Sequence, residues 1–222
     1  MRVKESSHLF KHKPEDTALD EQDRRDALMH IIRQDDQLMA LLSGLRTLDF
    51  PDWRLVSGAI YQTVWNVLTG QPQGYGIKDY DVAYFDASDL SYEAEDAVIK
   101  QAATALPDWC DRIEVRNQAR VHLWYPDRFG GAYPKLSCTD ESLENYMCTT
   151  HAVAVRLEHN GEISIAAPFG LADIFSLTIR PSTKLPSNQT HYGQKAKRMS
   201  QLWPQLKVLD WHSGKPVRPE FL

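Results

Sequence analysis

The sequence predicts an α/β (α+β) fold for this 222-residue chain, and two patterns support the prediction. Between Trp53 and Arg116, short apolar runs of strand character alternate with longer segments of helical periodicity. Further on, Asn160-Gly161 separates two alternating apolar runs, which is the strongest short-range signal of a β-hairpin. A hydrophobic content of 42% with six Trp indicates a packed core. We therefore expect residues 19–210 to form a single domain.

The two ends of the chain differ from this central part. Residues 1–18 are polar and are expected to be loose, and residues 211–222 are expected to form a C-terminal tail. His8 and His12 stand four residues apart, but no third ligand accompanies them, so we interpret them as part of the loose segment. The first residues lack the apolar run of a secretory signal. No apolar run approaches the roughly 18 residues that span a bilayer, so no membrane contact is expected.

The cysteine content favours a reducing compartment. The three cysteines are odd in number and form no CxxC pair, which predicts reduced thiols in a cytoplasmic protein: Cys110, Cys138 and Cys148.

The net charge of −5 is unevenly distributed. From Arg180 to Leu222 there are eight Lys or Arg against two Asp or Glu, whereas the rest of the chain has 17 basic and 28 acidic residues. An acidic body disfavours non-specific nucleic-acid binding, which depends on neutralising phosphates. The basic end has two interpretations, a solvated helix surface, which we favour, and a surface that faces an anionic ligand.

The first half of the chain predicts the following elements in order. Apolar residues at helical spacing predict one long helix or two short ones over 20–42, with Gly44 as the stop. A short strand over 53–56 leads into Ser57-Gly58. A helix over 59–68 follows, ends at Gly70, and is expected to bury Ile60, Val64, Val67 and Leu68. Residues 71–76 read as a loop and 79–85 as a strand.

The second half continues the alternation. Ser91 is expected to cap a helix that ends at Pro107 and buries Ala94, Val98, Ala102 and Ala105. We then expect a strand over 112–116 and helices over 117–125 and 140–147. A hairpin of 152–158 with 162–166 follows, and then a short helix and an extended piece over 171–179. The last predicted helix runs up to Pro204, and its buried side carries Tyr192, Ala196, Met199, Trp203 and Leu206.

Asp79 and Asp81 are the first candidates for chemistry. Side chains two residues apart on a strand leave the same face, and two carboxylates on one face repel unless a cation lies between them. Mg²⁺ is usually held by one or two carboxylates together with substrate phosphates. The alternative is an exposed Asp-rich turn, in which Lys78 neutralises Asp79.

Glu114 is a candidate third carboxylate. It lies between Ile113 and Val115 and points opposite to them on the predicted strand. If that strand lies beside 79–85, Glu114 joins the two Asp residues on one face. The alternative is a surface Glu paired with Arg112 or Arg116.

Ser57-Gly58 predicts a phosphate contact. The first amides of a helix are unpaired donors at the positive end of its dipole, and Gly58 permits a close approach of the backbone. The alternative is an ordinary helix cap formed by Ser57.

The order of these segments resembles the nucleotidyltransferase superfamily that includes DNA polymerase β. More closely, the chain is similar to a bacterial nucleotidyltransferase-like family formerly listed as a domain of unknown function. The similar segments cover roughly residues 25–210 and are SGAIYQTVWNVLTG (57–70), KDYDVAYFD (78–86), VRNQARVHLWY (115–125), TTHAVAVRL (149–157) and APFGLADIFSLTIRP (167–181). In two departures from the superfamily pattern, Ala59 follows Gly58, and the gap from Gly58 to Asp79 is longer.

The resemblance implies a nucleotidyltransferase fold: a mixed β-sheet flanked by helices, with a C-terminal hairpin and helix. It also implies that Asp79, Asp81 and Glu114 bind Mg²⁺, or Mn²⁺ in its place, and that Ser57 and Gly58 lie at the triphosphate of an NTP.

The expected activity is transfer of an NMP group from the NTP to an unidentified acceptor, with a small molecule or protein preferred over nucleic acid. The alternative is a catalytically silent nucleotide-binding, regulatory or interaction module.

Three further polar residues follow the Glu114 strand. Arg120 is a candidate phosphate ligand and His122 a candidate proton carrier, but we favour a structural hydrogen bond for each of them and for Asn117. Asp173 is interpreted as a helix-end residue. The chain has no GxSxG, Walker A or HExxH motif, so it offers no support for serine hydrolase, P-loop or zincin chemistry.

Overall fold

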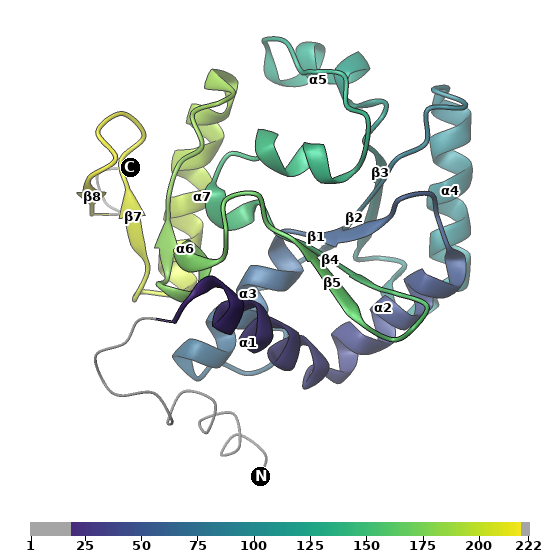
Figure 1. Ribbon diagram of the computed structural model, residues 1–222. Helices are drawn as coiled ribbons and strands as arrows, with labels where there is room; N and C mark the ends of the chain where they lie inside the picture. The colour runs from purple at the N-terminus through teal and green to yellow at the C-terminus, as the bar shows by residue number, and fades with distance from the viewer. Residues whose placement is uncertain (1–18, 219–222) are drawn as a thin grey trace.

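The computed structural model describes residues 19–218 (Figure 1). The predictions for residues 1–18, including His8 and His12, lie outside the described residues. The chain starts with α1 (Glu21–Arg33) and α2 (Asp36–Leu48), so two short helices form in place of one long helix. Asp35 separates them, because its carboxylate accepts a hydrogen bond from the Leu38 amide at 3.0 Å and caps α2.

The prediction that Gly44 stops this helix is wrong. Gly44 lies inside α2, where a Cβ atom would come within 2.3 Å of the Leu106 Cδ2 atom. The glycine therefore serves a close contact between α2 and the residue that follows α4 (Tyr92–Ala105).

A five-stranded mixed sheet forms the centre of the molecule, in the order β3-β2-β1-β4-β5. Its strands are β1 (Arg54–Val56), β2 (Tyr80–Tyr84), β3 (Ile113–Asn117), β4 (Ala154–Leu157) and β5 (Ile163–Ala166). β2 and β3 are parallel, and the other neighbours are antiparallel. The mixed sheet and the hairpin of β4 and β5 confirm the predicted fold.

The remaining helices connect and cover this sheet. They are α3 (Gly58–Thr69), α5 (Val121–Phe129), α6 (Ala172–Phe175) and α7 (Gln189–Leu202), with short 3-10 segments η2 (Pro107–Trp109), η3 (Asp140–Asn145), η4 (Thr149–His151) and η5 (Pro186–Asn188). In Figure 1, α1, α2 and α3 lie on one side of the sheet and α5 lies on the other. The segment 140–147 is thus a 3-10 turn where we expected a helix.

A small second sheet, which the sequence did not predict, lies beside α7. It joins β6 (Thr178–Ile179), β7 (Lys207–Leu209) and β8 (Pro216–Val217) in that order.

Two details of the predicted helix burial are wrong, because Val67 is 36% exposed and Ala105 is exposed. The predicted cap of α4 is confirmed, since the Ala94 amide donates to the Ser91 hydroxyl at 3.2 Å.

The two faces of the sheet pack against different apolar clusters. Tyr80, Val82 and Tyr84 of β2 belong to the main core, together with the apolar residues of α1, α2 and α3. Val56 and Ala83 belong to a small second cluster with Leu143 of η3. Because side chains alternate along a strand, Asp81 lies on the same face as Ala83. The acidic residues therefore leave the face opposite the main core.

Within residues 19–218, no helix combines the length and the apolar content that crossing a membrane requires.

Candidate functional site

The pairing of β2 with β3 brings two of the predicted carboxylates together. Asp81 and Glu114 are direct partners in this parallel pair, so their side chains leave the same face of neighbouring strands about 4.8 Å apart. Asp79 lies just before β2, two residues from Asp81, and is exposed. The arrangement that the sequence suggested for Asp81 and Glu114 is therefore present in the fold.

The three carboxylates interact electrostatically. The pKa of Asp81 rises to about 6, first because the group is largely buried and then because the charges of Asp79 and Glu114 lie close to it. The cations of Lys195 and Arg116 act in the opposite direction but do not cancel the rise. The ionised form of a buried carboxylate beside two others is unfavourable in free energy, and a bound cation would offset this repulsion.

Glu114 also has the basic neighbour that the alternative interpretation required. The Arg116 Nη2 atom lies 3.8 Å from its Oε2 atom, and about half of each side chain is exposed. An exposed pair at this distance contributes little to stability, so it leaves Glu114 free to exchange partners.

The donor set fits a metal ion that shares its ligands with a substrate. Within residues 19–218, no three His, Cys, Asp or Glu side chains converge closely enough to hold a metal by themselves. Mg²⁺ commonly takes only one or two carboxylates and completes its shell with waters and phosphate oxygens. Asp79 and Asp81 meet that requirement, with Glu114 at the adjacent position on β3.

Ser57 is held in a strained conformation at the start of α3. Its φ of 58° and ψ of −113° are rare for a residue with a side chain. Its amide donates to the Val153 carbonyl at 2.8 Å, and its side chain forms no capping hydrogen bond. Ser57 is therefore not the ordinary helix cap of the alternative interpretation.

Gly58 occupies a tight position directly after Ser57. It is the first residue of α3 and is buried, and a Cβ atom there would lie 2.9 Å from the Gln62 Nε2 atom. Gly58 is not one of the residues that line the adjacent cavity.

A cavity of about 630 Å³ lies over this face of the sheet. Ser57, Asp81, Glu114 and Arg116 line its floor, and α5 and α7 supply its walls. One wall is aromatic and consists of Trp124, Tyr125, Phe129, Tyr133, Tyr146 and His191. The ring centroids of Tyr125 lie 4.9 Å from Phe129 and 4.8 Å from Tyr133, so these side chains form a continuous surface.

Part of the wall is basic, and for two residues the interpretation of the C-terminal region as a solvated surface is wrong. Lys195 and Arg198 of α7 are both partly buried and line the cavity. Tyr61, followed by Asp81, Cys148 and Asp79, raises the pKa of Lys195 against the effect of burial, so its ammonium remains charged. The excess of Lys and Arg after Arg180 was the signal in the sequence, but only the fold shows where α7 lies.

His151 is a second residue of the cavity that sequence reasoning missed. It is 3% exposed, stacks on Tyr61 at a centroid distance of 4.9 Å, and its Nε2 atom has no hydrogen-bond partner within the described chain. Burial, and then the charge of Lys195, lowers the pKa of His151 well below 6.5, so the ring is neutral at physiological pH.

Arg120 lies elsewhere, and its expected role in phosphate binding needs correction. It is buried, its Nη1 atom pairs with the Glu95 carboxylate, and its Nε atom donates to the Leu90 carbonyl at 2.9 Å. It does not line the cavity. Arg120 therefore joins α4 to the segment after β3, which is the structural alternative.

The other polar candidates also lie outside the cavity. The Asn117 side chain accepts a hydrogen bond from the Asp86 backbone amide and donates one to the Asp86 carbonyl. The Asp173 carboxylate pairs with the Arg180 guanidinium at 2.8 Å and 3.0 Å. His122 does not line the cavity, and its Nδ1 atom is buried without a partner in the described residues. Asn117 and Asp173 therefore stabilise the fold around the site without facing it.

Comparison with known proteins agrees with this geometry. A family model described as nucleotidyltransferase matches residues 43–208. A structure solved by NMR, described as a CCA-adding enzyme head domain, superposes with a TM-score of 0.71 at 23% identity, covering 83% of this chain and 95% of the other. No curated protein matches the chain. The similarity to the NMR structure supports the fold, and the match over most of the length shows that the chain belongs to the nucleotidyltransferase family.

Proposed function

We propose that this protein transfers a nucleoside monophosphate from an NTP to a hydroxyl group of an acceptor and releases pyrophosphate. The observation that carries the proposal is the in-register pair of Asp81 and Glu114 on the floor of a cavity that strained Ser57 and the Lys195 ammonium also line. In the reaction, the acceptor oxygen bonds to the α-phosphorus and the bond to the bridging oxygen of pyrophosphate breaks. The hydroxyl proton passes to a carboxylate of the site.

Asp79, Asp81 and Glu114 would hold two Mg²⁺ ions, or Mn²⁺ in their place. Such ions, when bound, offset the charge on the phosphate oxygens and favour ionisation of the attacking hydroxyl. The raised pKa of Asp81 supports this assignment, because a cation at this position would relieve the repulsion among the three carboxylates.

Ser57 and Lys195 would position the triphosphate. The Ser57 hydroxyl caps no amide of α3 and lines the cavity, so it is available to donate to a phosphate oxygen. The first amides of α3 add the positive end of the helix dipole. Lys195 faces the same floor with its charge maintained, and it would neutralise the phosphates on the opposite side. Catalysis would rest mainly on positioning and charge neutralisation.

The aromatic wall would bind the planar parts of the substrates. A volume of about 630 Å³ lies in the range of about 300–1,000 Å³ that is typical of small-molecule sites. A small molecule or an exposed protein side chain fits a cavity of this volume better than a nucleic-acid duplex does.

One observation favours a second candidate function. Because no three acidic or metal-binding side chains of the described chain converge, the fold would also suit a nucleotide-binding or regulatory module without turnover. The two functions differ in whether pyrophosphate is released.

The test is a pyrophosphate assay. The protein is incubated with each labelled NTP, with Mg²⁺ or Mn²⁺, and with fractions of a cell extract as the source of acceptor. We expect pyrophosphate release, which the double variant Asp79→Ala, Asp81→Ala abolishes and Asp108→Asn, an exposed carboxylate of η2, leaves unchanged. NTP binding without pyrophosphate release in any fraction would contradict the enzyme proposal and favour the silent module.

A further inference from the structure

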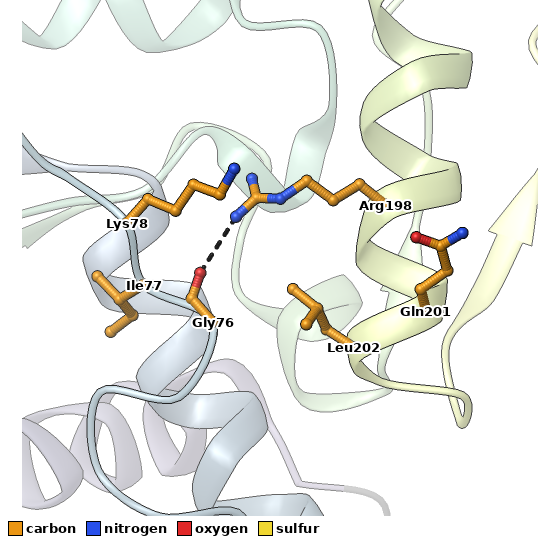
Figure 2. A pocket seen from close by; sticks show the side chains of 6 residues that line it. All are labelled: Gly76, Ile77, Lys78, Arg198, Gln201 and Leu202. Carbon is orange, nitrogen blue, oxygen red and sulfur yellow. Dashed lines mark hydrogen bonds between the residues drawn. The ribbon is translucent and has the colours of Figure 1, made fainter.

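A second, smaller cavity lies beside the main one and is basic. Its volume is about 260 Å³, and Figure 2 shows its lining residues: Gly76, Ile77, Lys78, Arg198, Gln201 and Leu202. Two of these residues are cations and none is acidic. A concave surface of this composition favours an anion.

The two cations point toward one another. In Figure 2 the Lys78 ammonium and the Arg198 guanidinium meet over the cavity, and the dashed line marks the bond from Arg198 Nη2 to the Gly76 carbonyl at 3.2 Å. Neither side chain forms an ion pair with a carboxylate in residues 19–218. Two like charges that face one another repel, and an anion between them would reverse the sign of that interaction.

The backbone of this cavity is held by Arg112 and by Trp203. Arg112 donates to the carbonyls of Ile77 at 2.8 Å and Lys78 at 3.2 Å. Gly76 has a φ of 75°, and a Cβ atom there would lie 2.4 Å from Trp203 Cη2, so the loop is packed tightly against the end of α7. The position of Lys78 relative to Arg198 is therefore set by the fold.

The small cavity is continuous with the proposed triphosphate path. Arg198 lines both cavities, and Lys195 lies one turn before it on the same face of α7. Lys78 directly precedes Asp79. The three basic side chains are therefore linked through the two cavities to the floor that carries Asp81: Lys195 and Arg198 line the main cavity, and Arg198 and Lys78 line the small one.

We propose that Lys78 and Arg198 bind the terminal phosphate of the nucleotide and so make the site select triphosphates over diphosphates. This inference rests on the proposed function. It assigns the selection of the substrate by its number of phosphates to Lys78, which lines only the small cavity, and to Arg198, which lines both cavities. Arg198 would contact a phosphate oxygen through the guanidinium nitrogens that Gly76 does not occupy, and Lys78 would contact it as a point charge.

The test is a comparison of triphosphate with diphosphate affinity. Dissociation constants for ATP, GTP, CTP and UTP and for the matching diphosphates are measured with Mg²⁺ by calorimetry. The variants are Lys78→Gln, Arg198→Gln and, as the matched control, Lys197→Gln. Lys197 lies on the same helix but is exposed and lines neither cavity.

We expect each variant of the pair to weaken triphosphate binding by roughly tenfold to a hundredfold, the value of one charge-assisted hydrogen bond, with diphosphate binding retained. The control should bind both as the parent does. Equal losses for triphosphate and diphosphate, or no loss, would overturn the inference while leaving the proposed function intact. A parent protein that binds no NTP would overturn both. Lys78 is exposed and its side chain forms no hydrogen bond with the rest of residues 19–218, so Lys78→Gln gives a valid result even if Arg198→Gln does not fold.

Discussion

Replacing Asp81 with Asn should stabilise the metal-free protein and abolish its activity. The carboxylate is largely buried beside Asp79 and Glu114, and its pKa is raised from 3.8 to about 6. A rise of this size corresponds to about 3 kcal/mol of unfavourable free energy for the ionised form. An amide of the same shape has no charge to bury, so we expect Asp81→Asn to gain about 1–3 kcal/mol at pH 7.5.

The gain should depend on pH with a defined sign. Because the folded state binds the Asp81 proton more tightly than the unfolded state, the parent loses stability as pH rises from about 4 to about 6. The advantage of the variant is therefore absent near pH 4 and complete above pH 6. Urea denaturation in EDTA at pH 4.0 and pH 7.5 measures both limits, and for a chain of this size each kcal/mol also shifts the melting temperature by about 2–4 °C.

Two controls make the test specific. Asp79→Asn removes an exposed carboxylate that repels Asp81, and it should raise the free energy of unfolding by less than Asp81→Asn does. Addition of Mg²⁺ should stabilise the parent and have no such effect on Asp81→Asn. If Asp81→Asn is no more stable than the parent at pH 7.5, or if its gain is the same at pH 4.0, the reasoning about uncompensated charge is refuted.

Three further substitutions separate the site from the scaffold. Ser57→Gly should relieve the positive φ and raise stability by about 1 kcal/mol while weakening NTP binding, and a loss of stability in a thermal melt would refute the strain argument. Glu95→Gln should lower the free energy of unfolding by about 3–5 kcal/mol in urea denaturation, because it leaves the buried Arg120 guanidinium without its ionic partner, and NTP affinity should be unchanged. A reduced NTP affinity would indicate that Arg120 takes part in nucleotide binding. Gly76→Ala should cost about 1–3 kcal/mol through contact with Trp203, and an unchanged melting temperature would contradict this packing.

The alternation of strands and helices was predictable because each element has its own local signal. Asn160-Gly161 marked the hairpin of β4 and β5, and Ser91 marked the start of α4. The proximity of Asp81 and Glu114 followed from one further assumption, that their strands are neighbours, which the parallel pair confirms.

Features set by packing between distant segments were not predictable. Gly44 reads as a helix stop, but its reason is the Leu106 side chain on another element. Arg120 reads equally as a phosphate ligand or a structural cation until Glu95 is seen beside it. The second sheet has strands of only two or three residues, too short to show a period.

The basic wall of the site illustrates the same limit. Lys195 and Arg198 were visible as part of a basic C-terminal region, but charge alone does not distinguish a solvated helix from one that faces a ligand. Their position depends on how Tyr192, Ala196 and Met199 pack α7 against the core. His151 gave no signal at all, because a single His in an apolar run is usually structural.

The central claim is that the β2–β3 carboxylates hold the metal ions on which an NTP is positioned. The most direct measurement is a crystal structure with Mn²⁺ and a non-hydrolysable NTP analogue, in which anomalous scattering locates the metal. We predict an Mn²⁺ peak coordinated by Asp79 and Asp81, with the phosphates extending from Ser57 past Lys195. A metal peak away from these carboxylates, or a nucleotide bound outside the cavity, would contradict the claim.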